Sequence, residues 1–587
     1  MDGLESGRIN LQGLVQQWLN WDKNEKTKKE IADLAQDLEK NGKELEKRLL
    51  QRMEFGTAGL RARMGAGNSM MNDLTIVQTA QGLVQFVLKD KPEVRQKGIV
   101  FGFDGRYNSD KWAKISAAVC INEGIPVYLF SKTCPTPYVP FSIKYFGATC
   151  GVMVTASHNP KDDNGYKVYW ENGAQIVSPI DKGISQSIAE NLQPLGTSWD
   201  ISEVESSPLC KDPYSEAMEG YNKALNSLCL HRDTNGSSTL KIVYTAMHGV
   251  GYPYVQEAFK AFGLPQPIPV DEQVVPDPEF PTVKYPNPEE GKGALLLATK
   301  KADSVGSPVI IANDPDADRL AVAEKLPNGE WKIFSGNEIG ALLGSWLWAC
   351  FQKKNSGVPA SDVYMIASTE TLTGFKWMGN KADELEKKGK TVLFAFEEAI
   401  GFMCGTNVLD KDGVSAAAVM AEFANQLYAQ NLTLEKQLEA IYTKYGYHLS
   451  SNSYFICHDP PTISRMFDEL RNMGGQGKYP DSCGPYKIQS VRDLTVGYDS
   501  SKADKKPVLP VSKSSQMITF TFENGCVATL RTSGTEPKIK YYTEHKPDPS
   551  KGLDRAGAER ELEDIVNKIR QHFFQPEKFG LIPRPDA

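Results

Sequence analysis

The chain has 587 residues, and at roughly 150 residues per domain this length predicts about four domains and excludes a single small module. Apolar residues make up 40% and charged residues 24%, a globular mix that excludes disorder as the main theme. Lys and Arg number 66 against 73 Asp and Glu, a net charge of -7, so no strongly basic field exists for nucleic acid or an anionic membrane. A local patch can still bind phosphate groups.

The cysteines and the first residues bear on the cellular compartment. The ten cysteines form no C-x-x-C pair and no zinc-knuckle spacing, which favours free thiols in a reducing compartment. The opening MDGLESGRINLQGL has no basic segment followed by an apolar run, and no stretch of about 18 uncharged apolar residues occurs. We expect a cytoplasmic protein without a membrane-spanning segment.

The first 50 residues have a helical pattern. They are rich in Gln, Lys, Glu and Leu, and apolar residues recur at helical intervals, for example at Ile31, Leu34 and Leu38. This predicts a helical lead-in at 1–50, although the same charge is also typical of a plain solvated face.

After Phe55, short apolar runs alternate with helical stretches, which predicts α/β layers. Expected strands are 98–103, 127–130, 150–155, 240–244, 309–313, 363–367 and 392–396, with a hairpin at 320–325 and 331–334. The last domain is expected to hold strands at 517–522 and 527–531 and a helix near 559–573, after a Gly/Pro/Ser-rich connection. The expected domains are 51–220, 221–338, 339–473 and 474–587, and the restarting α/β units are candidates for diverged copies of one fold.

Two nucleotide-binding motifs fail. Met70 stands where the third glycine of a dinucleotide turn belongs, and Glu384 stands where a P-loop needs its first glycine. We reject both.

The first strong motif is TASHNP, Thr155–Pro160, which follows a buried-looking strand. Pro160 stiffens the exit, and Asn164 with Gly165 is expected to form a tight turn. Ser157 should therefore lie on an exposed loop that phosphoryl groups can approach. The alternative is an ordinary Ser-rich turn.

The second motif is DPDADR, Asp314–Arg319, at the end of the strand 309–313. Alternating aspartates of an extended segment project to one side, and three carboxylates suit Mg²⁺. Arg319 replaces the glycine and Lys325 the glutamate of an EF-hand, which excludes that calcium site. A solvated acidic loop remains the alternative.

The third motif is RTSGTEPK, Arg531–Lys538, after another strand. It concentrates a guanidinium, hydroxyls and backbone amides, the components of a phosphate cradle. A polar β-turn would look similar.

Together TASHNP, DPDADR, FEEA and RTSGTEPK, in this order, resemble the α-D-phosphohexomutases. The strings EFGTAGLR, NGYKVYW, KYPNPEEGKG and FEEAIGF are similar to the branch of cytosolic phosphoglucomutases and phosphopentomutases. The resemblance implies a heart-shaped, four-domain molecule, with three similar α/β domains and a C-terminal α+β domain around a central cleft.

The resemblance also implies a role for each matching residue. Ser157 would be the phosphoserine, and Asp314, Asp316 and Asp318 would hold Mg²⁺ together with its phosphate. The residues around the transferring phosphoryl group would be Arg61, His158, Lys167, Arg319 and Lys411, with His158 and Lys411 as proton handlers. The sugar would be contacted by Thr373, Gly374, Glu397 and Ala399, and the distal phosphate by Arg531, Ser533, Gly534 and Thr535. Ala399 stands where glucose-preferring members carry serine, which agrees with a branch that also handles pentoses.

The implied activity is interconversion of ribose, deoxyribose or glucose 1-phosphate with the 5- or 6-phosphate, through phosphoserine and a bisphosphate intermediate. A sugar bisphosphate such as glucose 1,6-bisphosphate would be the activator, and the protein would be a monomer. A glucose 1,6-bisphosphate synthase is the alternative enzyme. Relatives carry an extra helix and strand near 368–371, so the resemblance also leaves open a catalytically impaired variant with an incomplete third domain.

Overall fold

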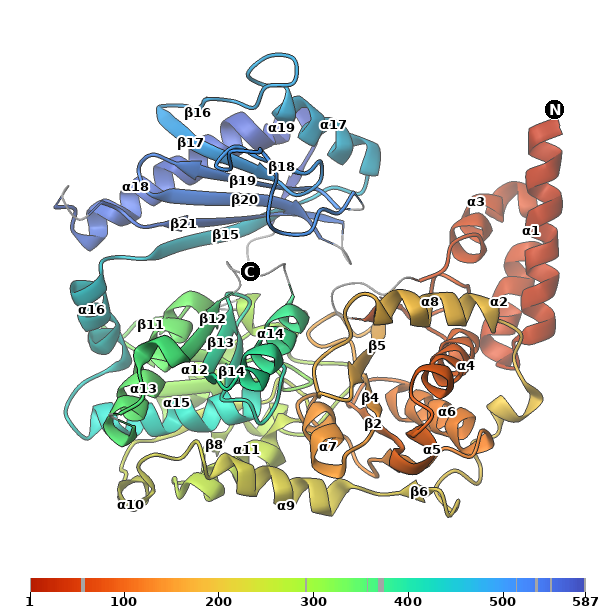
Figure 1. The fold of residues 1–587 in the computed structure, drawn as a ribbon, viewed down its shortest axis with the longest axis horizontal. Helices are drawn as coiled ribbons and strands as arrows, with labels where there is room; N and C mark the ends of the chain where they lie inside the picture. Colours follow the sequence, from red (N-terminus) through yellow and green to blue (C-terminus); the bar gives the residue numbers. More distant parts are fainter. Residues whose placement is uncertain are drawn as a thin grey trace. The chain divides into compact units, whose positions relative to one another are not determined.

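The computed structural model describes residues 2–53, 59–290, 293–355, 357–367, 374–513, 515–533, 537–548 and 552–584 (Figure 1). The chain divides into two compact units, Met1–Leu434 and Glu435–Ala587, and each is described by itself. The first unit contains three mixed sheets and the second contains one antiparallel sheet.

The first unit begins with three helices, α1 (Asp2–Trp21), α2 (Glu25–Ala35) and α3 (Leu38–Leu49). Asn24 and Asp37 cap α2 and α3 with their side chains, as N-cap residues do. Trp18, Ile31 and Leu45 are buried in one apolar cluster. The predicted helical lead-in is confirmed.

The first sheet has the order β1-β5-β4-β2-β3-β6. Its strands are β1 (Leu60–Arg63), β2 (Ile99–Phe103), β3 (Val127–Leu129), β4 (Cys150–Val154), β5 (Asp163–Trp170) and β6 (Cys210–Lys211), and the helices of this region are α4 (Asp73–Asp90), α5 (Val94–Lys97), α6 (Ser109–Asn122), α7 (Tyr138–Phe146), α8 (Ile180–Glu190) and α9 (Tyr214–Leu225). Strands β2, β3, β4 and β6 run parallel, while β5 pairs antiparallel with β4 and β1. The parallel strands β2 and β4 are buried throughout, as expected of a sheet covered on both faces.

The second sheet has the order β11-β10-β9-β7-β8. Its elements are α10 (Arg232–Asn235), β7 (Ile242–Thr245), α11 (Gly251–Phe262), β8 (Ile268–Pro269), α12 (Leu296–Val305), β9 (Val309–Ala312), β10 (Ala321–Lys325) and β11 (Trp331–Ile333). Strands β10 and β11 are antiparallel, which confirms the predicted hairpin.

The third sheet has three strands among the residues described, β12 (Val363–Ala367), β13 (Thr391–Glu397) and β14 (Gly401–Cys404). The helices of this region are α13 (Gly336–Lys354), α14 (Phe375–Lys387) and α15 (Gly413–Tyr428), and α16 (Leu434–Tyr445) follows as the first helix of the second unit. Strands β12 and β13, both expected from the sequence, are parallel, and α14 lies between them in the chain. Residues 368–371, where a helix and strand are expected in relatives, lie outside the described residues.

These three sheets share one local design. In each, a parallel strand passes to an antiparallel neighbour, through loops 155–162, 313–320 and 398–400. Each loop holds one non-glycine residue with positive φ: Ser157 (53°), Ala317 (52°) and Ile400 (52°). Such conformations are costly and concentrate at functional sites. The chemistry-bearing motifs therefore occupy equivalent loops of three similar units.

The second unit is an antiparallel sheet of order β16-β17-β19-β20-β21-β15-β22, with β18 paired to β17. Its strands are β15 (Leu449–Ile456), β16 (Ser482–Cys483), β17 (Tyr486–Asp493), β18 (Tyr498–Asp499), β19 (Met517–Phe522), β20 (Cys526–Thr532), β21 (Lys538–His545) and β22 (Ile582–Pro583), and its further helices are α17 (Pro460–Arg471), α18 (Arg555–Ile569) and α19 (Pro576–Phe579). The boundary expected at residue 474 is too late, because β15 completes this sheet beside β21 and the division falls at Glu435.

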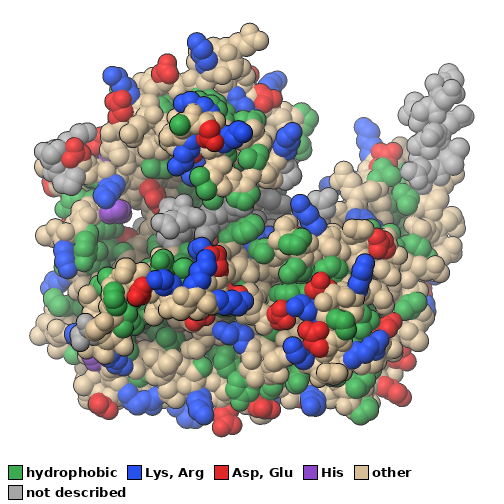
Figure 2. All heavy atoms as spheres, viewed as in Figure 1, with side chains coloured by type: hydrophobic (Ala, Val, Ile, Leu, Met, Phe, Trp, Pro, Cys, Tyr) green, Lys and Arg blue, Asp and Glu red, His purple; other side chains and the backbone are tan. Residues whose placement is uncertain are grey.

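The surface and the cysteines agree with the composition. Figure 2 shows Lys and Arg interspersed with Asp and Glu on the face in view. All ten cysteines are free thiols. Among the described residues, no helix combines the length and apolar character needed to cross a bilayer.

Candidate active site

Ser157 lies in the loop between β4 and β5. Its backbone N–H donates to Thr155 Oγ1 at 2.9 Å, and its hydroxyl donates to Asp314 Oδ2 at 2.9 Å. The Nδ1 atom of His158 is 3.2 Å from the same hydroxyl. The side chain was expected on an exposed loop, but Ser157 is only 3% exposed, and its hydroxyl contacts the buried Asp314.

Arg106 holds this loop from behind. Its guanidinium donates to the backbone carbonyls of four residues, at 2.5–3.2 Å: Ser157, Asn159, Pro160 and Asp163. Its Nε lies 3.3 Å from Asp104, whose carboxylate also accepts from the Thr155 hydroxyl. One buried cation thus fixes the backbone around Ser157.

The expected tight turn at Asn164 and Gly165 is wrong, because both residues lie in β5 and pair with β1. The Asn164 side chain is buried and donates to the Tyr107 carbonyl. Glycine is needed at 165 for close approach, since a Cβ there would lie 2.7 Å from the carbonyl oxygens of Leu60 and Thr155.

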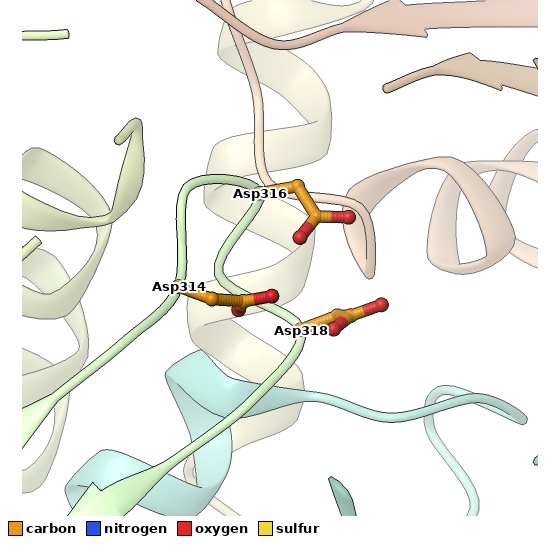
Figure 3. Close-up of side chains that lie close together, drawn as sticks. All are labelled: Asp314, Asp316 and Asp318. Carbon is orange, nitrogen blue, oxygen red and sulfur yellow. The ribbon is translucent and has the colours of Figure 1, made fainter. Parts of the chain in front are cut away.

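Asp314, Asp316 and Asp318 point their carboxylates toward a common space (Figure 3). One oxygen from each lies within 4.8 Å of the others, and all three residues are buried. The carboxylates converge because the loop turns near Ala317. The predicted extended segment with alternating aspartates is wrong. Thr136 fastens the turn, since its hydroxyl donates to Asp316 Oδ2 at 2.6 Å.

The carboxylates fit a divalent cation. The Oδ1 atoms of Asp316 and Asp318 are buried without a hydrogen-bond partner, a costly arrangement that a cation would satisfy. Burial, with repulsion from Asp316 and Asp318, raises the pKa of Asp314 well above its usual range. Burial alone would raise the pKa of Asp316 too, but Lys167 draws it below that range. The pKa values of Asp314 and Asp316 are therefore shifted in opposite directions.

This inequality predicts opposite effects of two substitutions in EDTA near neutral pH. A raised pKa means that the ionised form costs stability. Asp314→Asn should therefore raise the melting temperature, with a gain in the free energy of unfolding on the order of 1 kcal/mol. Asp316→Asn should lower the melting temperature, with a loss in the free energy of unfolding of about 1–3 kcal/mol, because Lys167 loses a charged partner. Both should abolish the stabilisation by added Mg²⁺ in thermal unfolding. Melting temperatures that shift in the same direction in both variants would contradict this prediction.

Four cations surround the triad. Lys167 Nζ donates to Asp316 at 2.8 Å and to Asp318 at 3.0 Å, and Lys411 Nζ lies 3.4 Å from Asp318. Burial would lower the pKa of Lys411, but Asp318 and two further carboxylates keep it above the usual range. The other two cations are Arg319, whose Nη1 donates to Glu289, and Arg61, whose Nη1 donates to Asn159. The Nε atoms of both arginines are buried without a hydrogen-bond partner, as suits donors awaiting an anion.

The hairpin between β13 and β14 brings Glu397 and Ala399 to the same region, since Gly401, which pairs with Glu397 in this hairpin, also bridges to Arg319. Gly374 is the N-cap of α14, and the next residue, Phe375, lies with its ring 5.5 Å from Lys411 Nζ. Burial raises the pKa of Glu397 to about 7, although Lys411 and Arg319 oppose this.

The raised pKa of Glu397 predicts a pH dependence of stability. The folded chain binds this proton more tightly than the unfolded chain, so the free energy of unfolding should fall as the pH rises from about 4.5 to about 7. Over this window the native chain should lose on the order of 1–2 kcal/mol of stability relative to Glu397→Gln, a reduced effect because the site is partly solvated. Denaturant unfolding in EDTA at several pH values measures it. A difference independent of pH would contradict the shift.

In the second unit, Arg531 donates to the Tyr542 hydroxyl at 2.8 Å, and its Nε is buried without a hydrogen-bond partner. The Ser533 N–H donates to the Lys538 carbonyl. Gly534 and Thr535, like Thr373, lie outside the described residues. A loop with an available guanidinium agrees with anion binding.

Sequence reasoning missed Arg106, Asp104 and Thr136. Asp104 and Arg106 follow directly on the buried strand β2, and charged residues at the end of such a strand were an available signal. Asp410 was also missed; it accepts from Tyr169 and from the Lys411 N–H, and so orients Lys411.

A buried serine, three converging carboxylates and four cations are the kinds of group that phosphoryl transfer requires. Family models for phosphoglucomutase/phosphomannomutase alpha/beta/alpha domains I, II and III match residues 52–194, 219–328 and 360–445. The chain belongs to this mutase family.

Three similar relatives cover nearly the whole chain. Phosphopentomutase from Homo sapiens is 54% identical, with 97% of each chain covered. Glucose 1,6-bisphosphate synthase from Homo sapiens is 50% identical over 99% of this chain and 97% of the relative. Phosphoribomutase from Saccharomyces cerevisiae is 37% identical over 99% of both.

Solved structures show the same fold. A putative phosphomannomutase from Thermus thermophilus aligns with a TM-score of 0.61 at 19% identity, covering 88% of this chain and 99% of that one. Parafusin, a phosphoglucomutase from Paramecium, aligns with a TM-score of 0.60 at 18% identity, covering 88% and 96%. The α/β fold class expected from the sequence is confirmed.

Proposed function

We propose that this chain is a Mg²⁺-dependent mutase that interconverts pentose 1- and 5-phosphates, and glucose 1- and 6-phosphates, through phosphoserine at Ser157. The observation that supports it best is the 2.9 Å contact between the Ser157 hydroxyl and Asp314 inside the acidic triad. A bound Mg²⁺ would lie between Asp314, Asp316 and Asp318 and would neutralise charge on the phosphoryl group.

The residues of this chain can serve each part of the reaction. In the first transfer the bond from phosphorus to Ser157 Oγ breaks and a bond to the sugar hydroxyl oxygen forms; the sugar hydroxyl gives up its proton to a base, and Ser157 Oγ takes one up. We propose that His158, whose Nδ1 lies 3.2 Å from Oγ, supplies that proton to Oγ and removes it in the return transfer. Lys411, whose raised pKa keeps it protonated, would donate to oxygens or stabilise charge, as would Lys167. The bisphosphate then turns over and returns its other phosphate to Ser157.

Two observations favour pentose phosphates alongside hexose phosphates. Ala399 offers no hydroxyl in the β13–β14 hairpin, so it provides one hydrogen bond fewer to a hexose. The 54% identical relative is a phosphopentomutase. Glu397 would bind ring hydroxyls, and Thr373 and Gly374 would contact the sugar. Arg531, Ser533, Gly534 and Thr535 would bind the distal phosphate.

A glucose 1,6-bisphosphate synthase is the second candidate, supported by relatives that are 50% identical over almost the same length. A mutase needs only a catalytic amount of sugar bisphosphate. A synthase accumulates bisphosphate at the expense of an added phosphoryl donor. Product analysis with and without a donor separates the two.

Intact mass spectrometry followed by substrate exchange tests the mechanism. We expect a phosphate on Ser157 that is lost on incubation with ribose or glucose 1-phosphate, and conversion of these sugars with Mg²⁺ and a trace of bisphosphate. A folded chain that neither carries nor exchanges phosphate would instead support the impaired variant.

A further inference from the structure

The backbone of Arg319 is held at the site, and its guanidinium forms an ion pair with Glu289. Its backbone N–H donates to Asp314 Oδ1 at 3.0 Å, a contact within the loop 313–320. Its side chain is 12% exposed, and Nη1 donates to Glu289 Oε2 at 2.9 Å. Its Nε lies 4.0 Å from Asp314 Oδ2 and makes no hydrogen bond. The guanidinium therefore donates to Glu289 through Nη1, while its Nε–H has no hydrogen-bond acceptor.

Glu289 comes from outside the sheets. It lies in the short turn Pro288–Glu290, where the buried Asn287 side chain accepts the Glu289 N–H at 3.1 Å. The Glu289 side chain is 33% exposed, and its carboxylate makes no contact with the triad among those the structure describes. Asn287 Nδ2 also donates to Glu289 Oε2 at 3.4 Å, so Asn287 helps to orient the partly solvated carboxylate that contacts Arg319.

A carboxylate in this place competes with a phosphoryl group. Arginine forms bidentate pairs with either anion, and two anions on one fork repel each other. A dianionic phosphate adjoining the acidic triad needs the whole guanidinium as a counter-charge.

We infer that Glu289 occupies, in the ligand-free chain, the position on Arg319 that a phosphoryl group of the substrate takes during the reaction. Glu289 keeps the guanidinium oriented and partly neutralised until the sugar phosphate displaces it. It is a positioning residue, and this inference rests on the proposed function.

A binding measurement in a variant that cannot turn over the substrate tests the role of Glu289. In a Ser157→Ala background, isothermal titration calorimetry with glucose 1-phosphate should show roughly 3- to 10-fold tighter binding for Glu289→Gln, because the competing charge is gone. Raising the salt concentration should narrow this gap. Glu289→Asp, which retains the charge, should bind like the Ser157→Ala parent. The control is Asp271→Asn, which removes a carboxylate paired with Lys301 in the same domain and should change nothing.

The outcomes separate this inference from the proposed function. If Glu289→Gln binds equally or more weakly while its melting temperature is normal, the inference is overturned. If the Ser157→Ala parent binds no sugar phosphate, the proposed function fails first. Glu289→Ala tests the same expectation should the glutamine variant fold poorly.

Discussion

Replacing Ser157 by alanine is expected to lower mutase activity by at least about 1,000-fold, because the proposed reaction stores the phosphoryl group on this oxygen between the two transfers. The contact with Asp314 at 2.9 Å places the hydroxyl at the triad, where the metal and the surrounding cations would act on it. A coupled assay of ribose and glucose 1-phosphate conversion, with Mg²⁺ and bisphosphate, measures the loss. The fold should persist, since only one hydroxyl is removed.

Ser185→Ala is a suitable control, because that exposed hydroxyl donates to the Asp181 carbonyl on α8. It should retain full activity and the same phosphate content. Activity of Ser157→Ala within about tenfold of the native chain would exclude a serine-bound intermediate.

The residues of the candidate site could be proposed from the sequence, whereas their geometry could not. The motifs singled out Ser157 and the aspartates, the family resemblance added Lys411, and the structure brings these side chains together. Their convergence depends on three similar sheets that each present a loop at one place, which periodicity cannot show. The burial of Ser157, whose hydroxyl contacts Asp314 157 residues away in the chain, could not be predicted from the local sequence.

The boundary before the last unit shows the same limit. Residues 474–514 have the composition of a connection, yet they contain β17 and β18 of the last sheet. β15 joins that sheet by pairing with β21, a contact between segments far apart in sequence. Local composition records turns, whereas domain membership is decided by long-range strand pairing.

The equivalent loops also explain why one domain needs another. The loop of the first sheet supplies the serine hydroxyl, and the loop of the second sheet supplies the carboxylates. Thr136 of the first domain fastens Asp316 of the second, while Lys411 of the third reaches Asp318. Catalysis should therefore be sensitive to groups that hold these loops in register, and the buried Arg106 is one of them.

Arg106→Met should lower the free energy of unfolding of the first unit by about 3–5 kcal/mol, because it leaves Asp104 without its cation and four loop carbonyls without donors. Activity should fall as well, since the Ser157 backbone is no longer fixed. Denaturant unfolding of the full chain measures the stability. Arg95→Met is the matched control, because that side chain is 51% exposed and should cost less than about 1 kcal/mol. If Arg106→Met were as stable as the control variant, the guanidinium would not be what holds the serine loop.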